Sequence, residues 1–160
     1  MGTNIVIYLE LFRDGKWVCK PYPMFNPEQD YDLFSVLAGV RRSGPRKRVD
    51  PLVTNRGLPH DLSDSVKYDW LEWGDGMHDE NYLTLAELRE GAKKIRVSNI
   101  TPDTWVFPDE DKLLPWSFST LLSDLECYAS REYSTLRAQE GKEKVVLQPD
   151  QIRIVFWFDN

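Results

Sequence analysis

An arginine-rich segment is the first part of this sequence with the residue types for chemistry. Residues 41–57 read RRSGPRKRVDPLVTNRG and contain five arginines and one lysine. A guanidinium presents a planar fork of donors that matches phosphate or carboxylate in bidentate fashion. Arg41, Arg42 and Arg56 are therefore candidate phosphate ligands. The same composition also fits a solvated loop, or one docked on the protein's own carboxylates.

A second segment, WLEWGDGMHDENY, places aromatic side chains around a polar turn that contains glycine. Trp70, Trp73 and Tyr82 could stack on a nucleobase or wall it, as aromatic residues do in proteins that bind single strands. Asp75 and His78 could bond ribose hydroxyls or base edges. The alternative is that the aromatic residues belong to the core and that the glycines only form a turn.

Together the two segments supply the apolar walls and polar anchors of a small-molecule pocket. We therefore expect a phosphate-bearing nucleotide as the ligand. Asp61 lies between the segments and is included in this candidate site. It is also a carboxylate that would hold Arg56 if that guanidinium were structural.

Catalytic signatures do not accompany this candidate site. The sequence has no Walker A motif, dinucleotide glycine fingerprint, G-x-S-x-G or H-E-x-x-H. We expect a binding protein with no catalytic residue, no metal and no cofactor. The enzyme alternative is a hydrolase of nucleotide-like substrates that uses His78 as acid or base with Asp75, Asp79 or Glu80.

Composition limits the class of protein. The chain has 160 residues and a formal net charge of −6, so we expect one domain over residues 1–160 and no nucleic-acid partner. Its apolar runs are too short for a membrane span. Cys19 and Cys127 are too few for a disulfide framework or a zinc site, and indicate free thiols in a reducing cytoplasm.

The elements that must position these residues predict an α+β fold. Asn4–Phe12 and Trp17–Tyr22 form a hairpin around Asp14-Gly15, because Asp-Gly favours tight hairpin turns. Short helices are expected over 32–40, 63–73 and 84–94, the last begun by the capping box of Thr84 and Glu87. The residues that follow the second of these helices, up to Asn81, are expected to form a polar loop.

One long helix is expected near residues 115–139, where apolar residues recur with helical spacing. Residues 151–159 (QIRIVFWFD) are apolar on both alternating faces, which predicts an interior strand. Pairing this strand with the hairpin gives a small antiparallel sheet, with the helices packed on one face. Residues 95–107 remain open between short strands and an extended connection.

Several stretches resemble a widespread family of uncharacterised bacteriophage and bacterial proteins. They are Asp30–Arg41 (DYDLFSVLAGVR), Arg56–Lys67 (RGLPHDLSDSVK), Trp73–Gly76 (WGDG), Tyr82–Leu88 (YLTLAEL) and Arg153–Asn160 (RIVFWFDN). The family usually has Arg where Gln29 stands and D-G-H-S-H-S-W where this chain has GMHDENY. Glu80 thus replaces the second histidine, which puts a shared catalytic role in doubt.

The resemblance implies a phage or mobile-element origin and a place in the host cytoplasm. Small acidic phage proteins of this kind are often anti-defence factors, some of which sequester immune signals such as cyclic ADP-ribose isomers or cyclic dinucleotides. That role agrees with the arginine and aromatic segments. The remaining alternative is an inhibitor whose acidic surface and exposed aromatics contact a host protein. A homo-oligomer is compatible with either role, because a pocket at a subunit interface buries its ligand more fully.

Overall fold

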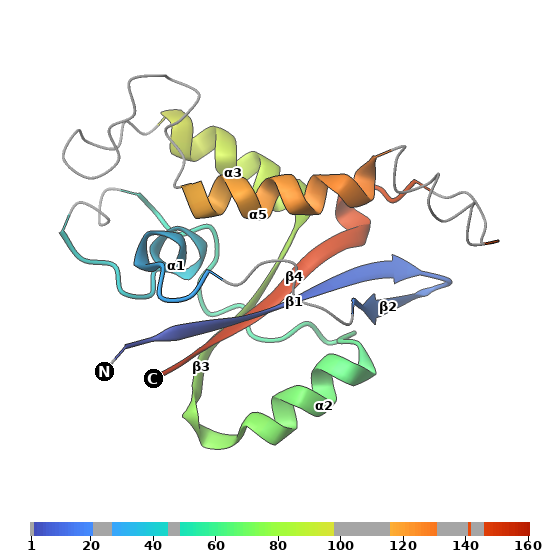
Figure 1. Ribbon diagram of the computed structural model, residues 1–160, viewed down its shortest axis with the longest axis horizontal. Coiled ribbons are helices and arrows are strands. Elements are labelled where there is room, and N and C mark those ends of the chain that lie inside the picture. The colour runs from blue at the N-terminus through green and yellow to red at the C-terminus, as the bar shows by residue number, and fades with distance from the viewer. Residues whose placement is uncertain (1, 21–26, 45–48, 98–115, 131–140, 142–145) are drawn as a thin grey trace.

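A four-stranded antiparallel sheet in the order β2-β1-β4-β3 organises the molecule. The computed structural model describes residues 2–20, 27–44, 49–97, 116–130, 141 and 146–160. The strands are β1 (Asn4–Arg13), β2 (Lys16–Cys19), β3 (Met77–Thr84) and β4 (Ile152–Asp159), with β4 between β1 and β3 (Figure 1). The predicted α+β class is confirmed.

The N-terminal hairpin forms where Asp14-Gly15 predicts it. Both turn residues have positive φ, 52° and 80°, as a two-residue hairpin turn requires, and Arg13 pairs with Lys16. The returning strand β2 ends at Cys19, and residues 21–22 lie outside the described part of the chain.

The C-terminal strand belongs to the same sheet as the hairpin, as predicted. Its register on β1 runs from Asn4 opposite Asp159 to Leu11 opposite Ile152. Every residue of β4 before Asp159 is buried. Because successive side chains of a strand point to opposite faces, such a strand must be covered on both sides.

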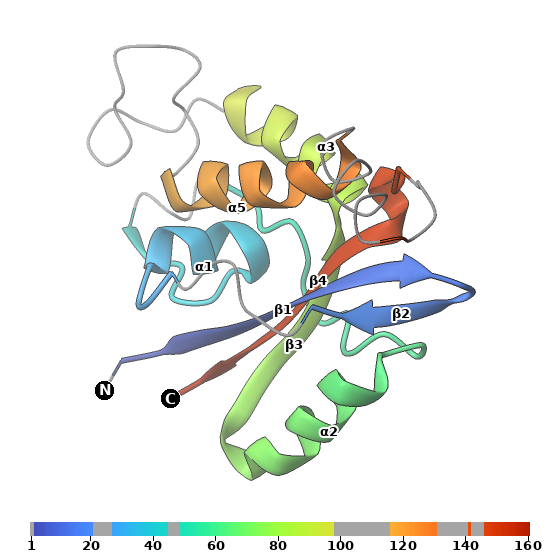
Figure 2. The ribbon, with the colours of Figure 1, turned by 45° about the vertical axis from the view of Figure 1, so that its right-hand side comes forward.

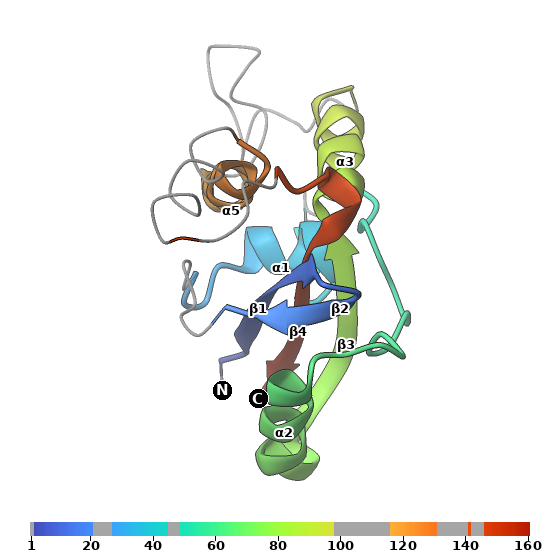
Figure 3. The same cartoon turned by 90° about the vertical axis from the view of Figure 1, so that its right-hand side faces the viewer.

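Helices cover both faces of the sheet, so the prediction that they pack on one face is wrong. The helices α1 (Tyr31–Ala38), α3 (Leu85–Val97) and α5 (Trp116–Glu126) lie on one side, and α2 (Asp64–Trp73) lies on the other (Figures 1 and 3). The physical reason is the second apolar face of β4. There Val155 and Trp157 pack with Val66 of α2.

The strand β3 was missed in the sequence, where a polar loop was expected up to Asn81. A bulge between His78 and Asn81 shifts its register against β4, and Asp79 adopts a positive φ of 53° within it. The bulge breaks the alternation of apolar residues by which a strand is predicted. Polar residues also suit this strand because it lies at the edge of the sheet.

The ends of α3 and α5 can be compared with the ends predicted from the sequence. Thr84 and Glu87 make the predicted capping box: the Glu87 amide donates to Thr84 Oγ1, and the Thr84 amide donates to Glu87 Oε2. The long helix is shorter than the predicted 115–139, because α5 ends at Glu126 and a 3-10 turn follows over Cys127–Ala129. Ser130 closes that turn, donating both its amide and its hydroxyl to Cys127 O. Residues 131–140 lie outside the described residues.

Candidate functional site

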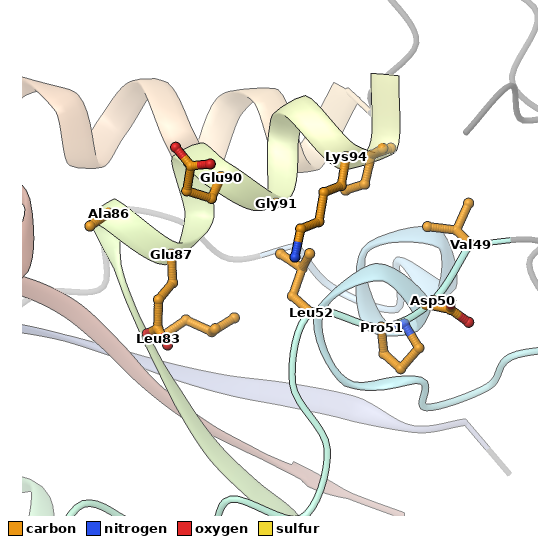
Figure 4. A pocket seen from close by; sticks show the side chains of 11 residues that line it. Val49, Asp50, Pro51, Leu52, Leu83, Ala86, Glu87, Glu90, Gly91 and Lys94 are labelled. Carbon is orange, nitrogen blue, oxygen red and sulfur yellow. The ribbon is translucent and has the colours of Figure 1, made fainter. Parts of the chain in front are cut away.

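A cavity of about 620 Å³ lies between α3 and the extended segment 49–52 (Figure 4). Its size falls within the range of pockets that hold small organic ligands. Apolar side chains line much of it, and charged side chains stand among them. The apolar lining includes Val49, Pro51, Leu52, Leu83 and Ile95, and the charged residues are Asp50, Glu87, Glu90 and Lys94.

Backbone bonds fix the segment that forms one side of the cavity. The amides of Leu52 and Val53 donate to Val36 O and Leu37 O, which ties the segment to α1. Leu52 reaches α3 at Gly91, where an added Cβ would lie 2.5 Å from the leucine Cδ2. Any larger residue at this position would therefore force the Leu52 side chain to move.

Arg42 is not one of the lining residues, but it binds two of them. Its guanidinium donates to Val49 O at 3.2 Å and to Asp50 Oδ1 at 3.2 Å. The Asp50 side chain is 99% exposed, so this ion pair contributes little to folding and its carboxylate can be exchanged for another anion. From α3 the Lys94 amine points toward Leu52 (Figure 4).

Arg56 is bound to a carboxylate that lines the cavity. Its guanidinium makes two bonds to Glu87, of 2.8 and 3.0 Å, and a third to Tyr82 O at 2.9 Å. Burial raises the pKa of Glu87, but the bonds from Arg56 and Thr84 outweigh it and hold that pKa below its ordinary value. The predicted phosphate ligand Arg56 is thus paired with Glu87, and not with Asp61.

The backbone beside Arg56 also covers the edge of the sheet. The Arg56 amide donates to Asn81 Oδ1, and the Gly57 amide donates to Glu80 O on β3. The arginine side chain lies over the Tyr82 ring, 4.9 Å from its centroid. These contacts occupy backbone groups that an open edge strand would expose, so Arg56 has a structural role.

Arg41 is placed away from the cavity lining. Its Nε donates to Thr3 Oγ1 at 2.7 Å, and its guanidinium lies over the Tyr31 ring, 5.7 Å from the centroid. The three arginines predicted to share one phosphate site are therefore divided. Arg42 and Arg56 each bind a carboxylate that lines the cavity, whereas Arg41 contacts the start of the chain and α1.

The predicted aromatic wall does not line this cavity. Trp70 belongs to α2 and packs edge-on against Trp157, on the opposite face of the sheet from α3. Trp73, which is 44% exposed, ends the same helix, and Asp75 is exposed in the turn that follows. Tyr82 points to that same second face. The fold therefore separates the aromatic and cavity-lining groups that the sequence suggested as one pocket.

His78 is held by its neighbours rather than presented to a substrate. Its Nδ1 lies 2.6 Å from Asp79 Oδ2, and its ring stacks on Phe158 with the centroids 6.0 Å apart. Its Nε2 is buried and has no hydrogen-bond partner within the described part of the chain. A general base must reach the proton that it removes, and this nitrogen is closed to solvent.

A buried ionic network around Arg153 was missed by the sequence reasoning. Arg153 Nε lies 2.7 Å from Glu10 Oε1, and its Nη1 lies 2.8 Å from Asp61 Oδ1. Trp17 donates to Asp61 Oδ2, and the arginine lies 3.9 Å from the centroid of the Trp17 ring. Asp61, predicted as a ligand-binding residue, is thus a partner of Arg153. The sequence did contain a signal for this network, because Glu10 and Arg153 are the charged residues within two otherwise apolar strands. In the sheet these two residues lie opposite each other.

Burial raises the pKa of Asp61, but the bonds and charge of Arg153, with the bond from Trp17, bring it below its ordinary value.

In the part of the chain that the structure describes, no three His, Cys, Asp or Glu side chains are grouped to hold a metal ion. None of the described helices is long and apolar enough to cross a membrane. Comparison with protein-family models, with curated proteins and with solved structures finds no match.

Proposed function

We propose that this protein binds and sequesters a small phosphate-bearing nucleotide in the cavity between α3 and residues 49–52. The observation that carries the proposal is the cavity itself: about 620 Å³, largely apolar in its lining, with four charged side chains among the lining residues. Small-molecule pockets combine apolar walls with a few polar anchors in this way.

Each part of such a ligand has a chemically matched group. Lys94, which lines the cavity, and Arg42, which binds the lining residues Val49 and Asp50, are the cations for phosphate. Glu90 is an acceptor for ribose hydroxyls. The base would lie on the apolar surface of Leu52 and Leu83.

Retention of the ligand, rather than turnover, agrees better with these residues. Glu87 already accepts bonds from Arg56 and Thr84, so it is a poor proton acceptor at neutral pH. His78, the candidate acid or base of the hydrolase alternative, has its free nitrogen buried and is absent from the cavity lining. Sequestration needs a preformed site and no reacting group.

The wider role follows from the resemblance to phage proteins. A phage protein that retains a cyclic ADP-ribose-like molecule or a cyclic dinucleotide would remove an immune signal from the infected host, and would be an anti-defence protein. The acidic chain, with its net charge of −6, is suited to a small anion only through local cations such as Lys94 and Arg42.

Calorimetric titration with cyclic ADP-ribose, ADP-ribose and a panel of cyclic dinucleotides tests the proposal. We expect at least one of these to bind at about one per chain, and Lys94→Ala to weaken it about 10- to 100-fold, as for a lost hydrogen bond to a charged group. Lys67→Ala, an exposed lysine on α2, is the matched control and should bind normally.

Mass spectrometry of the ligand released by heat separates binding from hydrolysis. Intact nucleotide supports sequestration, and a cleaved product would establish the hydrolase alternative. If none of the panel binds, or if Lys94→Ala and Lys67→Ala bind equally well, the cavity is not the nucleotide site.

A further inference from the structure

The outer face of α2 exposes large apolar side chains. Of the five large hydrophobic residues that are exposed among the described residues, three lie on this one helix. Tyr68 is 64% exposed, Leu71 is 67% exposed and Trp73 is 44% exposed. Tyr68 and Leu71 are neighbours on the outward side of the helix, whereas Trp73 follows Val66 by seven residues and Trp70 by three, on the side that faces the sheet. Two adjacent large apolar side chains with this exposure form a small contact surface.

The helix is held so that this face stays outward. Val66 is fully buried against Val155 and Trp157, and Trp70 packs on Trp157 from the same side of the helix. Tyr68 and Leu71 are three residues apart and project from the other side, as neighbours on a helix surface do.

The end of the helix is also fixed to the sheet. Tyr8 of β1 lies beside Asp69 and Trp73, and burial together with the Asp69 carboxylate raises the Tyr8 pKa to about 12, although Trp73 acts in the opposite direction. The exposed groups are thus presented on a rigid element, which lowers the ordering cost of binding.

Acidic residues surround the apolar ones. Residues 64–76 contain four carboxylates, Asp64, Asp69, Glu72 and Asp75, and one lysine, Lys67. Asp64, Glu72 and Asp75 are exposed. This charge disfavours a second copy of the chain at the same face, since like charges would oppose each other, and it disfavours nucleic acids and anionic membranes.

We propose that Tyr68 and Leu71, with the exposed carboxylates of α2 and its following turn, form a docking surface for another protein whose apolar groove has a basic rim. An amphipathic helix that lays apolar side chains into a groove is a recurrent mode of recognition. The acidic residues meet the rim, direct the approach and set the orientation. This surface is independent of the proposed nucleotide cavity, which lies on the other side of the sheet.

A selection for proteins that bind the intact chain tests this surface without knowledge of the natural partner. The probe is a display library of a small helical-hairpin scaffold whose groove residues are randomised, selected on the wild-type protein. We expect grooves rich in apolar residues with Arg or Lys at the rim. The Tyr68→Ser/Leu71→Ser double variant should bind a selected scaffold at least about tenfold more weakly.

Two further variants give the test its controls. Val146→Ser removes an exposed apolar residue elsewhere and should leave binding of the scaffold unchanged. The comparison requires that Val146→Ser and the double serine variant have the melting temperature of the wild type. Glu72→Lys/Asp75→Lys should weaken binding and reduce its dependence on salt. The proposal is overturned if no scaffold is enriched, if the enriched grooves are acidic or neutral, or if the double serine variant still binds them as tightly.

Discussion

Replacement of Arg153 by methionine tests whether the buried ionic network stabilises the fold. The Arg153 side chain is 4% exposed and the Glu10 side chain is 0% exposed, with 2.7 Å between Nη2 and Oε1. Glu10 also accepts the Ser63 amide at 2.8 Å, at the start of α2. Methionine keeps much of the side-chain volume but leaves the Glu10 carboxylate buried without its cation.

The expected loss is about 3–5 kcal/mol of unfolding free energy, the range for breaking a buried pair by removing one partner. Solvent screening does not reduce this figure, because both side chains are almost fully covered. The variant also loses the contact with the Trp17 ring and the bond to Asp61. Since domains are stable by only about 5–15 kcal/mol, the change removes a large part of the total.

Urea unfolding followed by tryptophan fluorescence measures the loss, and two further proteins interpret it. Glu10→Leu/Arg153→Met removes both charges and should be more stable than Arg153→Met alone, because no unpaired charge stays buried. Arg89→Met breaks the half-exposed pair with Glu126 and should cost at most about 1 kcal/mol. The reasoning fails if Arg153→Met costs no more than Arg89→Met, or if the double variant is less stable than the single one.

Four other outcomes are expected. Arg56→Ala should lower the free energy of unfolding by about 1–2 kcal/mol, because a part-exposed pair and an aromatic contact are lost; an unchanged melting temperature with weaker nucleotide binding would restore its phosphate role. Glu87 has a lowered pKa, so its contribution to stability is complete above its ordinary value of 4.5 and is lost as the pH falls through the lower folded value. Acid titration of Glu87→Gln should show a shallower loss, and an identical profile would contradict this. Burial, aided by the charge of Glu10, raises the Cys19 pKa to about 11, so iodoacetamide near neutral pH should modify the exposed Cys127 first; equal rates in mass spectra would refute it. Deletion of residues 151–160 removes buried side chains worth roughly 1.5–3 kcal/mol each and should abolish folding, which a cooperative melt of the truncated protein would disprove.

The elements that could be predicted from the sequence are those whose signal is local. Asp14-Gly15 predicts a hairpin because the turn needs two successive residues with positive φ, and few residue types adopt that conformation. The run from Ile152 to Phe158 is apolar on both faces and therefore belongs inside a sheet. The edge strand β3 was not predicted because its bulge at Asp79 interrupts the alternation of apolar residues. The end of α5 at Glu126 was not predicted because apolar residues continue with helical spacing beyond it.

The candidate site could be predicted only in its residue types, because its pairings join distant parts of the chain. Arg56 and Glu87 are 31 residues apart, and Arg153 and Asp61 are 92 apart. The composition indicates that arginines and lysines will form ion pairs with carboxylates, but the fold determines which residues pair. The aromatic segment and the basic segment likewise looked like one pocket, until the sheet placed α2 and the cavity on opposite faces.

The exposure of each carboxylate decides which arginine suits an incoming phosphate. To bind a ligand, a guanidinium must give up the anion it already holds, and the free energy of that exchange grows as the pair becomes more sheltered from water. Asp50 beside Arg42 is 99% exposed and makes one bond with it, whereas Glu87 beside Arg56 is 39% exposed and makes two. Arg56 also holds the Tyr82 carbonyl at the sheet edge. A phosphate in the cavity would therefore displace Asp50 from its arginine more easily than Glu87, and Arg56, one of the three arginines that the sequence suggested for phosphate, has a structural role at the sheet edge.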